Sequence, residues 1–412
     1  MKPTVTGNSQ WMKSLNRSLV LNKIREDGPI SRADVAKRTS LTPPTVTHLV
    51  QELLEERYIV ESDIGVSSGG RKPILLRLNP EAYYSIGIDV GVHSVKSVVS
   101  NLSGEIILQD KRLMPSPVSG ETLLQLLVQS VQELLAGSSL HPSALLGIGI
   151  GMHGLVNPMS GLSLFAPNLG LRGVPLKEEL ERRTGIPVHV ENDAAAMALG
   201  ELWFGGGQGL RDFICVNIGE GVGAGIVVDG RLHRGSRFSA GEIGHTTVDL
   251  NGPRCSCGNY GCLQTQVSGP AIADKLRKHL ALGGTSRVLE LADGELERIT
   301  GQLVYEAAQQ GDPAARDAFR QTGQLLGISL TNLIHTLNPE KIILGGGVSQ
   351  AGAYILDPVH TTVRSRALES TAEGLTIEAS PLGELATAIG AVTIVLSKLF
   401  SPSPSPPVPQ ES

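Results

Sequence analysis

Residues 241–263 read GEIGHTTVDLNGPRCSCGNYGCL, and this stretch contains three of the four cysteines of the 412-residue chain. His245, Cys255, Cys257 and Cys262 follow the spacing His-x9-Cys-x-Cys-x4-Cys. One imidazole and three thiolates complete a tetrahedral Zn²⁺ site with no open position, which is the structural rather than the catalytic arrangement. In a cytosolic chain such crowding indicates metal binding before it indicates a disulfide. A redox role is less favoured because no Cys-x-x-Cys pair is present.

The segments around this knot predict an α/β body. Buried apolar strands end in glycine clusters at Leu145–Gly151 and again at Lys341–Gly347, and amphipathic helices lie between the strands. The repeated strand–glycine–strand pattern favours two related α/β lobes over one doubly wound sheet. We expect strands within 85–90, 96–101, 105–110, 145–151, 213–228 and 341–347, and helices at 120–136 and over much of 268–336.

The first 80 residues have a different pattern, in which three short helices are followed by two strands. Ser31 is a natural N-cap for the second helix, and Thr42 for the third, where Pro43 takes the first helical position. Strands at 58–60 and 74–78 flank a Gly/Ser turn at 65–70. This order predicts a winged helix-turn-helix. The apolar face of the first helix is expected to contain Leu15, Leu19, Leu21 and Ile24.

Two features of this head favour DNA as its partner. The third helix begins with short hydrogen-bonding side chains, at the end that enters the major groove in such modules. At the hairpin tip, Arg71 follows two glycines and can enter a narrow minor groove, while Lys72 can neutralise a phosphate. A protein-interaction module is the alternative, and it does not account for both features together. The expected major-groove contacts are Thr42, Thr45, Thr47 and His48.

The charge is unevenly distributed along the chain. Residues 1–80 contain 12 Lys/Arg and 8 Asp/Glu, giving +4, and the remainder contains 23 and 32, giving −9, which together make the net charge of −5. A basic head on an acidic body fits a nucleic-acid-binding head. No apolar run reaches the roughly 18 residues that span a bilayer, and Met1–Trp11 has no signal-peptide core. The expected compartment is therefore the cytoplasm, without membrane attachment.

Taken together, residues 85–396 resemble the ROK family of repressors, open reading frames and kinases. The head makes the whole chain similar to the repressor branch, which includes xylose- and N-acetylglucosamine-responsive repressors. The most specific match is the zinc signature within 241–263. Further matching stretches are Pro167-Asn168-Leu169, Val190-Glu191-Asn192-Asp193-Ala194 and Leu344-Gly345-Gly346-Gly347-Val348.

The resemblance implies a two-lobed sugar-kinase fold related to actin and hexokinase (RNase H-like), with sugar bound between the lobes. The aspartate that matches Asp193 acts as the general base in family kinases, although Asn192-Asp193 can also be read as a helix N-cap. Gln264 replaces the glutamate that usually follows the zinc knot. The residues expected to bind sugar hydroxyls are Asn168, Asn192, Asp193, Glu242, His245 and Gln264.

Two departures from the family's kinase pattern affect the phosphate loops. Val92 stands where the first loop has its second glycine, and Glu220 replaces the threonine of a Gly-Thr-Gly loop. A carboxylate there would face the triphosphate and repel it. The expected protein is therefore not an enzyme.

These interpretations combine into one expected organisation: a winged helix-turn-helix at 1–80, a first lobe at 81–195 completed by a helix at 384–400, a second lobe at 196–383 with the zinc knot and an oligomerisation surface, and a disordered Pro/Ser tail at 401–412. The expected function is a sugar-responsive repressor of carbohydrate-utilisation genes. Its expected partners are double-stranded operator DNA, a sugar effector and a second copy or more of itself, as a homodimer or homotetramer. The alternatives are an ATP-dependent hexose or N-acetylhexosamine kinase with an appended head, and a DNA-bound scaffold that no longer senses sugar.

Overall fold

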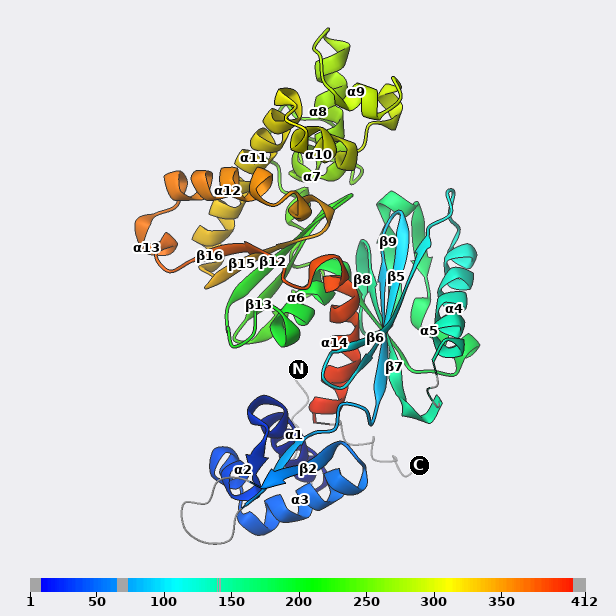
Figure 1. The fold of residues 1–412 in the computed structure, drawn as a ribbon, viewed down its shortest axis with the longest axis vertical. Coiled ribbons are helices and arrows are strands. Elements are labelled where there is room, and N and C mark those ends of the chain that lie inside the picture. The colour runs from blue at the N-terminus through cyan, green and yellow to red at the C-terminus, as the bar shows by residue number, and fades with distance from the viewer. Residues whose placement is uncertain (1–8, 65–72, 139, 141, 403–412) are drawn as a thin grey trace.

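The computed structural model describes residues 9–64, 73–138, 140 and 142–402. A small N-terminal head lies below two α/β lobes, which stand side by side (Figure 1). Arg71 and Lys72 lie outside the described residues, as does the tail from 403 onward, so these parts of the sequence analysis stay predictions.

The head is a three-helix unit with a small antiparallel sheet. Ser31 and Thr42 cap its second and third helices, because their hydroxyls accept hydrogen bonds from the amides of Asp34 at 3.1 Å and Thr45 at 3.4 Å. The sheet has the order β1-β3-β2, and β1 is a short strand that the sequence analysis missed. The elements are α1 (Ser9–Asp27), β1 (Ile30–Ser31), α2 (Arg32–Thr39), α3 (Pro43–Glu55), β2 (Ile59–Ile64) and β3 (Ile74–Leu78).

One part of the predicted core of α1 is wrong. Leu15 and Leu19 are 39 % and 40 % exposed, whereas Val20, Leu21 and Ile24 are buried. Leu15 and Leu19 are one turn apart and lie on the side of the helix opposite Ile24, so they cannot share its buried stripe.

The first lobe is built on a five-stranded sheet of order β11-β7-β4-β5-β6. Its β4-β5-β6 part is antiparallel, and β7 and β11 are added in parallel. Helices α4 and α5 cover one face, and a small sheet of order β10-β9-β8 lies beside it (Figure 1). The elements are β4 (Tyr84–Val90), β5 (Ser94–Asn101), β6 (Ile106–Leu113), α4 (Gly120–Ala136), β7 (Leu145–Met152), β8 (Leu155–Asn157), β9 (Leu162–Ala166), β10 (Leu171–Val174), α5 (Leu176–Thr184) and β11 (Val188–Asn192).

The second lobe repeats this plan with the order β14-β13-β12-β15-β16, again three antiparallel strands extended by two parallel ones. The prediction of two related lobes is thus confirmed. Its strands are β12 (Phe213–Ile218), β13 (Val222–Val228), β14 (Arg231–His233), β15 (Lys341–Gly345) and β16 (Thr376–Ala379). Its helices are α7 (Gln264–Val267), α8 (Gly269–Ala281), α9 (Val288–Leu291), α10 (Gly301–Gln309), α11 (Pro313–Leu337), α12 (Ala353–Arg366) and α13 (Glu369–Ala372).

Two apolar helices, α6 (Asp193–Phe204) and α14 (Ala386–Phe400), cross in the centre of the molecule (Figure 1). Their backbones touch at Gly390, where a Cβ would lie 1.8 Å from the carbonyl oxygen of Ala196. Helix α14 also packs on β4 and β7 of the first lobe. By length and composition the stretch Gly383–Phe400 could cross a membrane, contrary to the expectation that no stretch could, yet 67 % of it is buried in the protein.

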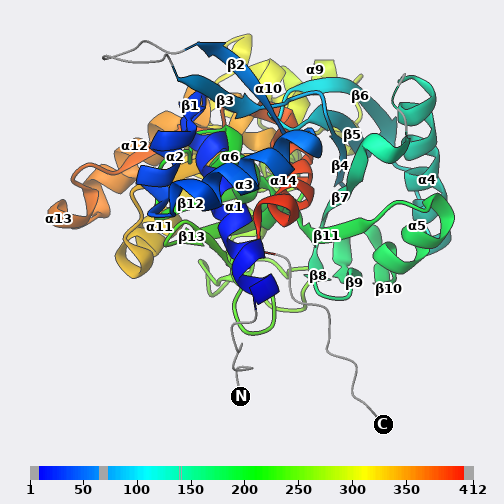
Figure 2. The ribbon, with the colours of Figure 1, turned by 90° about the horizontal axis from the view of Figure 1, so that it is seen from below.

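The head packs directly on this central pair. One hydrophobic cluster joins Ile24 and Leu49 of the head with Val392, Leu396 and Phe400 of α14, and α1 lies beside α14 (Figure 1, Figure 2). The amide of Asn22 donates to the carbonyl of Phe400 at 2.7 Å. The head is therefore fixed to the lobes by a shared core as well as by the chain.

Candidate functional site

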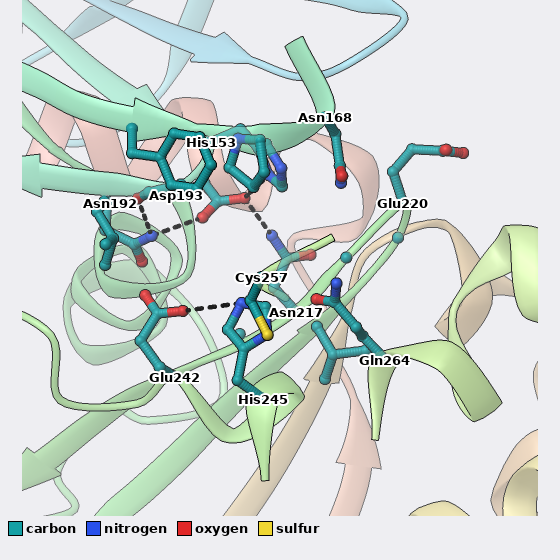
Figure 3. Close-up of a pocket in the computed structure, with 18 of the residues that line it drawn as sticks. His153, Asn168, Asn192, Asp193, Asn217, Glu220, Glu242, His245, Cys257 and Gln264 are labelled. Atoms are coloured by element: carbon teal, nitrogen blue, oxygen red, sulfur yellow. Dashed lines mark hydrogen bonds and ion pairs between the residues drawn. The ribbon is translucent and has the colours of Figure 1, made fainter. Parts of the chain in front are cut away.

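A cavity of about 520 Å³ lies between the two lobes. Residues at the carboxyl ends of the first sheet form one wall, and the β12–β13 turn and the 242–264 region form the other (Figure 3). The structure brings all six residues expected to bind sugar to this one cavity, and their binding of sugar stays a prediction. Its polar lining is His153, Asn168, Asn192, Asp193, Asn217, Glu220, Ser239, Glu242, His245 and Gln264.

The start of α6 lines the cavity with Asn192 and Asp193. Asn192 is the N-cap, and its side-chain oxygen accepts from the amide of Ala195 at 3.0 Å. Its amide nitrogen donates to the carbonyl of Gly154 at 2.9 Å and to Asp193 Oδ1 at 3.0 Å. The N-cap interpretation is therefore confirmed, and the cap fixes Asn192 against the strand end opposite.

Both oxygens of the Asp193 carboxylate have protein partners. Oδ1 also accepts from the amide of Ala194 at 2.9 Å. Oδ2 accepts from Asn217 Nδ2 at 3.3 Å and lies 3.6 Å from His153 Nδ1 (Figure 3). The carboxylate is thus held by groups from both lobes, because Asn217 belongs to β12 and His153 follows β7.

His153 is a lining residue that the sequence analysis missed. Its side chain is only 15 % exposed, and its Nε2 is buried without a hydrogen-bond partner among the described residues. Burial lowers the pKa of His153, whereas the hydrogen bond and charge of Asp193, with Glu242 and Asp89, raise it above the ordinary value overall. The sequence could have indicated His153 as a lining residue, because it follows a buried strand whose last residue pairs in parallel with Asn192.

Carboxylates dominate the electrostatics of the cleft. Burial raises the pKa of Glu242, and the nearby charge of Asp193 raises it further. Behind the cavity, burial raises the pKa of Asp89 to about 7, although Lys96 opposes this shift. Among the described residues that line the cavity there is no lysine or arginine. The cavity therefore has acidic and neutral hydrogen-bonding groups.

The predicted metal ligands form one cluster beside the cavity. The ligand atoms of His245, Cys255, Cys257 and Cys262 all lie within 4.8 Å of one another. Cys255 Sγ is 3.6 Å from His245 Nδ1, and Cys257 Sγ is 3.8 Å from Cys262 Sγ. A tetrahedral zinc ion with Zn–S bonds of about 2.3 Å places its sulfurs roughly 3.8 Å apart, so the cluster has the size and donors of such a site.

The cluster and the cavity share side chains. His245 turns Nδ1 toward the sulfurs, while its Nε2 lies 3.8 Å from Glu242 Oε2 at the cavity (Figure 3). Gln264 donates its amide to Cys255 Sγ at 3.3 Å. Such outer partners orient metal ligands. The tight loop depends on Gly261, which has a φ of +64°, and a Cβ there would lie 1.6 Å from the carbonyl oxygen of Asp249.

The two altered phosphate loops meet across the cleft. Glu220 lies in the turn between β12 and β13, and His93 lies in the turn between β4 and β5. His93 Nε2 is 3.1 Å from Glu220 Oε1. Val92, Gly219 and Glu220 line both the first cavity and an adjoining one of about 660 Å³. Glu220 therefore stands at the boundary between the two cavities.

The predicted DNA contacts lie at the start of α3, where Thr42, Thr47 and His48 are exposed and Thr45 is half-buried. Thr42 caps the helix and its hydroxyl lies 2.8 Å from that of Thr45, while Thr47 donates to the carbonyl of Pro43 at 2.9 Å. His48 Nε2 lies 3.3 Å from Glu52 Oε1. Their contacts with DNA stay predictions.

A winged helix-turn-helix joined to a two-lobed sugar-kinase fold defines a class of proteins that combine a DNA-binding head with a cleft for a small molecule. Residues 85–398 match the ROK family, and residues 16–60 match the winged helix-turn-helix DNA-binding family. The chain belongs to the ROK family. The family resemblance stated from the sequence is thereby confirmed.

Curated relatives span nearly the whole chain. The xylose repressor of Caldicellulosiruptor bescii is 35 % identical over 395 residues, covering 96 % of this chain and 98 % of its own. The transcriptional dual regulator NagC of Escherichia coli is 31 % identical and covers 94 % of each chain.

Solved structures support the same placement. A ROK-family transcriptional regulator described as a homolog of the E. coli MLC protein has a TM-score of 0.82 and 31 % identity, covering 95 % of this chain and 97 % of its own. A ROK-family glucokinase from Streptomyces griseus, in complex with glucose and AMPPNP, has a TM-score of 0.70 and 34 % identity. It covers 98 % of its own chain but 76 % of this one.

Proposed function

We propose that this protein is a DNA-binding transcriptional repressor whose operator affinity is controlled by a sugar in the cavity between the lobes. The observation that carries the proposal is the position of α6. Its N-cap Asn192 and its first residue Asp193 line the cavity, and its last residues, Trp203 and Phe204, pack in the cluster that contains the head. Repression as the direction of control is supported by the whole-length repressor relatives.

The contact between α6 and the head provides a route for coupling. The guanidinium of Arg25 in α1 lies 4.2 Å from the ring centroid of Trp203 and 5.3 Å from that of Phe400. A sugar that draws the lobes together would displace α6 relative to α14, and the head shares its core with α14. A coupling free energy of about 1–3 kcal/mol between the sugar site and the DNA site would change DNA affinity about 5–150-fold.

We infer that the protein is not a kinase. Phosphoryl transfer depends on loops that approach the phosphates closely and neutralise them. Here Val92 and Glu220 occupy those loops, and Glu220 is paired with His93 across the cleft. An active hexose or N-acetylhexosamine kinase would need both loops to rearrange.

We propose Zn²⁺ as the metal of the His245–Cys262 cluster, with a structural role. When bound, the ion would hold the loop that carries Glu242, His245 and Gln264, and so keep these side chains at the cavity. We also propose that the protein acts in the cytoplasm as a homodimer or homotetramer. Two heads would then read a palindromic operator whose half-sites are about one helical turn apart.

The function can be tested by letting the protein select its own operator. The metal-loaded full chain is used to select bound duplexes from a random DNA pool, and ADP release from ATP is measured with xylose, glucose and N-acetylglucosamine. We expect a palindromic sequence to be enriched and ADP release to equal that of Asp193→Ala. Failure to enrich any sequence would overturn the proposal. Sugar-dependent ADP release that Asp193→Ala abolishes would overturn it in favour of the kinase.

A further inference from the structure

Glu220 occupies a position from which it can select among ligands of the cavity. It lies in the turn between β12 and β13, on the boundary that the sugar cavity shares with the adjoining cavity. Its side chain is 34 % exposed, and His93 from the opposite lobe lies 3.1 Å away. A group that extends from the first cavity toward the second must therefore pass close to this carboxylate.

The charges of the first cavity are unfavourable for an anion. Asp193, Glu242 and Glu220 contribute carboxylates, and no lysine or arginine is among its described lining residues. Phosphate groups in proteins are usually held by Arg or Lys. The basic side chains Lys96 and Arg277 line the adjoining cavity instead, beyond Glu220.

The start of α6 does not compensate for this lack of cations. A helix N-terminus can bind phosphate through its free amides. The amides of Ala194 and Ala195 are already bonded to Asp193 Oδ1 and Asn192 Oδ1, at 2.9 Å and 3.0 Å. The chain's own side chains thus occupy the positions that a phosphate would take.

The remaining polar groups suit hydroxyl groups. Gly221 faces three side chains of the cavity. A Cβ built on Gly221 would lie 3.6 Å from Gln264 Oε1, 3.7 Å from Asn168 Nδ2 and 3.3 Å from His153 Cε1. An acceptor and a donor therefore converge on one open space of the cavity wall, and a sugar hydroxyl both donates and accepts.

We propose that the effector is a neutral, unphosphorylated sugar, and that Glu220 is the specificity-determining residue that rejects its phosphorylated form. This inference rests on the proposed function, because it names the ligand class of the same cavity. Glu220 acts by repulsion: a phosphate ester brings about two negative charges toward a carboxylate in a partly enclosed cleft. His93 holds the carboxylate in place across the cleft.

The test is isothermal titration calorimetry on the metal-loaded full chain. The probes are xylose, glucose, N-acetylglucosamine, glucose 6-phosphate and N-acetylglucosamine 6-phosphate. We expect a free sugar to bind at least about tenfold more tightly than a phosphorylated one. In Glu220→Gln, which keeps the size of the side chain, we expect the affinity for the phosphorylated form to rise about tenfold while that for the free sugar changes little. Glu297→Gln, an exposed carboxylate elsewhere in the second lobe, is the control and should change neither.

The outcomes separate this inference from the proposed function. Tighter binding of a sugar phosphate by the wild type, or an unchanged preference in Glu220→Gln, would overturn the inference. If that sugar phosphate also releases the selected DNA, the proposed function stands and only the inference fails. If no sugar, free or phosphorylated, binds or affects the DNA complex, both fail. Should Glu220→Gln not fold, Glu220→Thr gives a second neutral variant for the same comparison.

Discussion

The guanidinium of Arg25 in the head lies 4.2 Å from the ring centroid of Trp203, at the end of the helix whose first residues line the cavity. Arg25 is also 5.3 Å from the Phe400 ring at the end of α14. A planar guanidinium beside an aromatic ring is a contact worth about 0.5–2 kcal/mol. One side chain of the head therefore contacts both central helices.

Arg25→Ala should uncouple the head from the cavity. We expect sugar affinity to be retained and the effect of sugar on DNA affinity to fall to less than about a third of its wild-type value, because the loss is of the size of one cation–π contact. Fluorescence anisotropy of labelled DNA, with and without sugar, measures the ratio of the two dissociation constants for DNA. Arg25→Lys, which keeps the charge and loses the planar stacking, should give an intermediate ratio. A wild-type ratio in both variants would show that coupling does not use this contact.

Removal of the metal should disorder the cavity wall. We expect one zinc ion per chain by elemental analysis, and loss of sugar binding in Cys257→Ser, because His245 and Gln264 depend on the cluster for their positions. Cys215 is buried in β12, outside the cluster. Cys215→Ala is therefore the matched control and should retain its zinc. Sugar binding of normal affinity by zinc-free Cys257→Ser would contradict this role.

Asp89 should make the stability of the lobes depend on pH. Burial raises its pKa from 3.8 to about 7, so the folded protein holds a proton that the unfolded chain releases. Its contribution to stability is therefore fully present below about pH 4 and is lost as the pH rises toward 7. Asp89→Asn cannot lose this contribution, and its melting temperature should exceed that of the wild type by a few degrees at pH 7.5 and by clearly less at pH 5, which lies nearer the start of the range between the two pKa values. Thermal denaturation at both pH values checks this, and an equal difference at the two would exclude Asp89 as the cause.

The predicted wing residues should differ in their effects on DNA binding. Lys72→Ala should weaken binding to all sequences and reduce the slope of log K against log[salt] by about 1, because one phosphate contact is lost. Arg71→Ala should reduce discrimination most at A/T-rich positions, where the minor groove is narrow. Anisotropy titrations at several salt concentrations measure both. Unchanged affinity in the two variants would remove the wing from the interface.

Local sequence patterns are sufficient to predict the His/Cys cluster and the repeated lobes. Its four members lie within 18 residues of chain, from His245 to Cys262, and glycines such as Gly261 permit the turns that bring them together. The lobes are predictable because strand ends and glycine clusters recur in the same order. The N-cap role of Asn192 is predictable as well, since that signal is also local.

Contacts between distant segments are not predictable in this way. The His93–Glu220 pair joins turns of different lobes, and Arg25 meets Trp203 from another domain. No local periodicity encodes such pairs. The prediction for Leu15 and Leu19 is wrong for a related reason, because it combines apolar residues from the two sides of α1 into one stripe. His153 could have been found by asking which residues follow parallel strands at the same edge of the sheet.

Control of DNA binding by a sugar in the cavity can be measured on the operator itself. The selected operator duplex is labelled, and its affinity for the metal-loaded full chain is measured by anisotropy with and without a saturating concentration of the sugar that binds. We expect the sugar to weaken operator binding at least about fivefold, and a cavity variant such as Asn168→Ala to need more sugar for the same effect. Operator affinity that is the same with and without saturating sugar would exclude control by sugar and leave a DNA-bound scaffold as the better description.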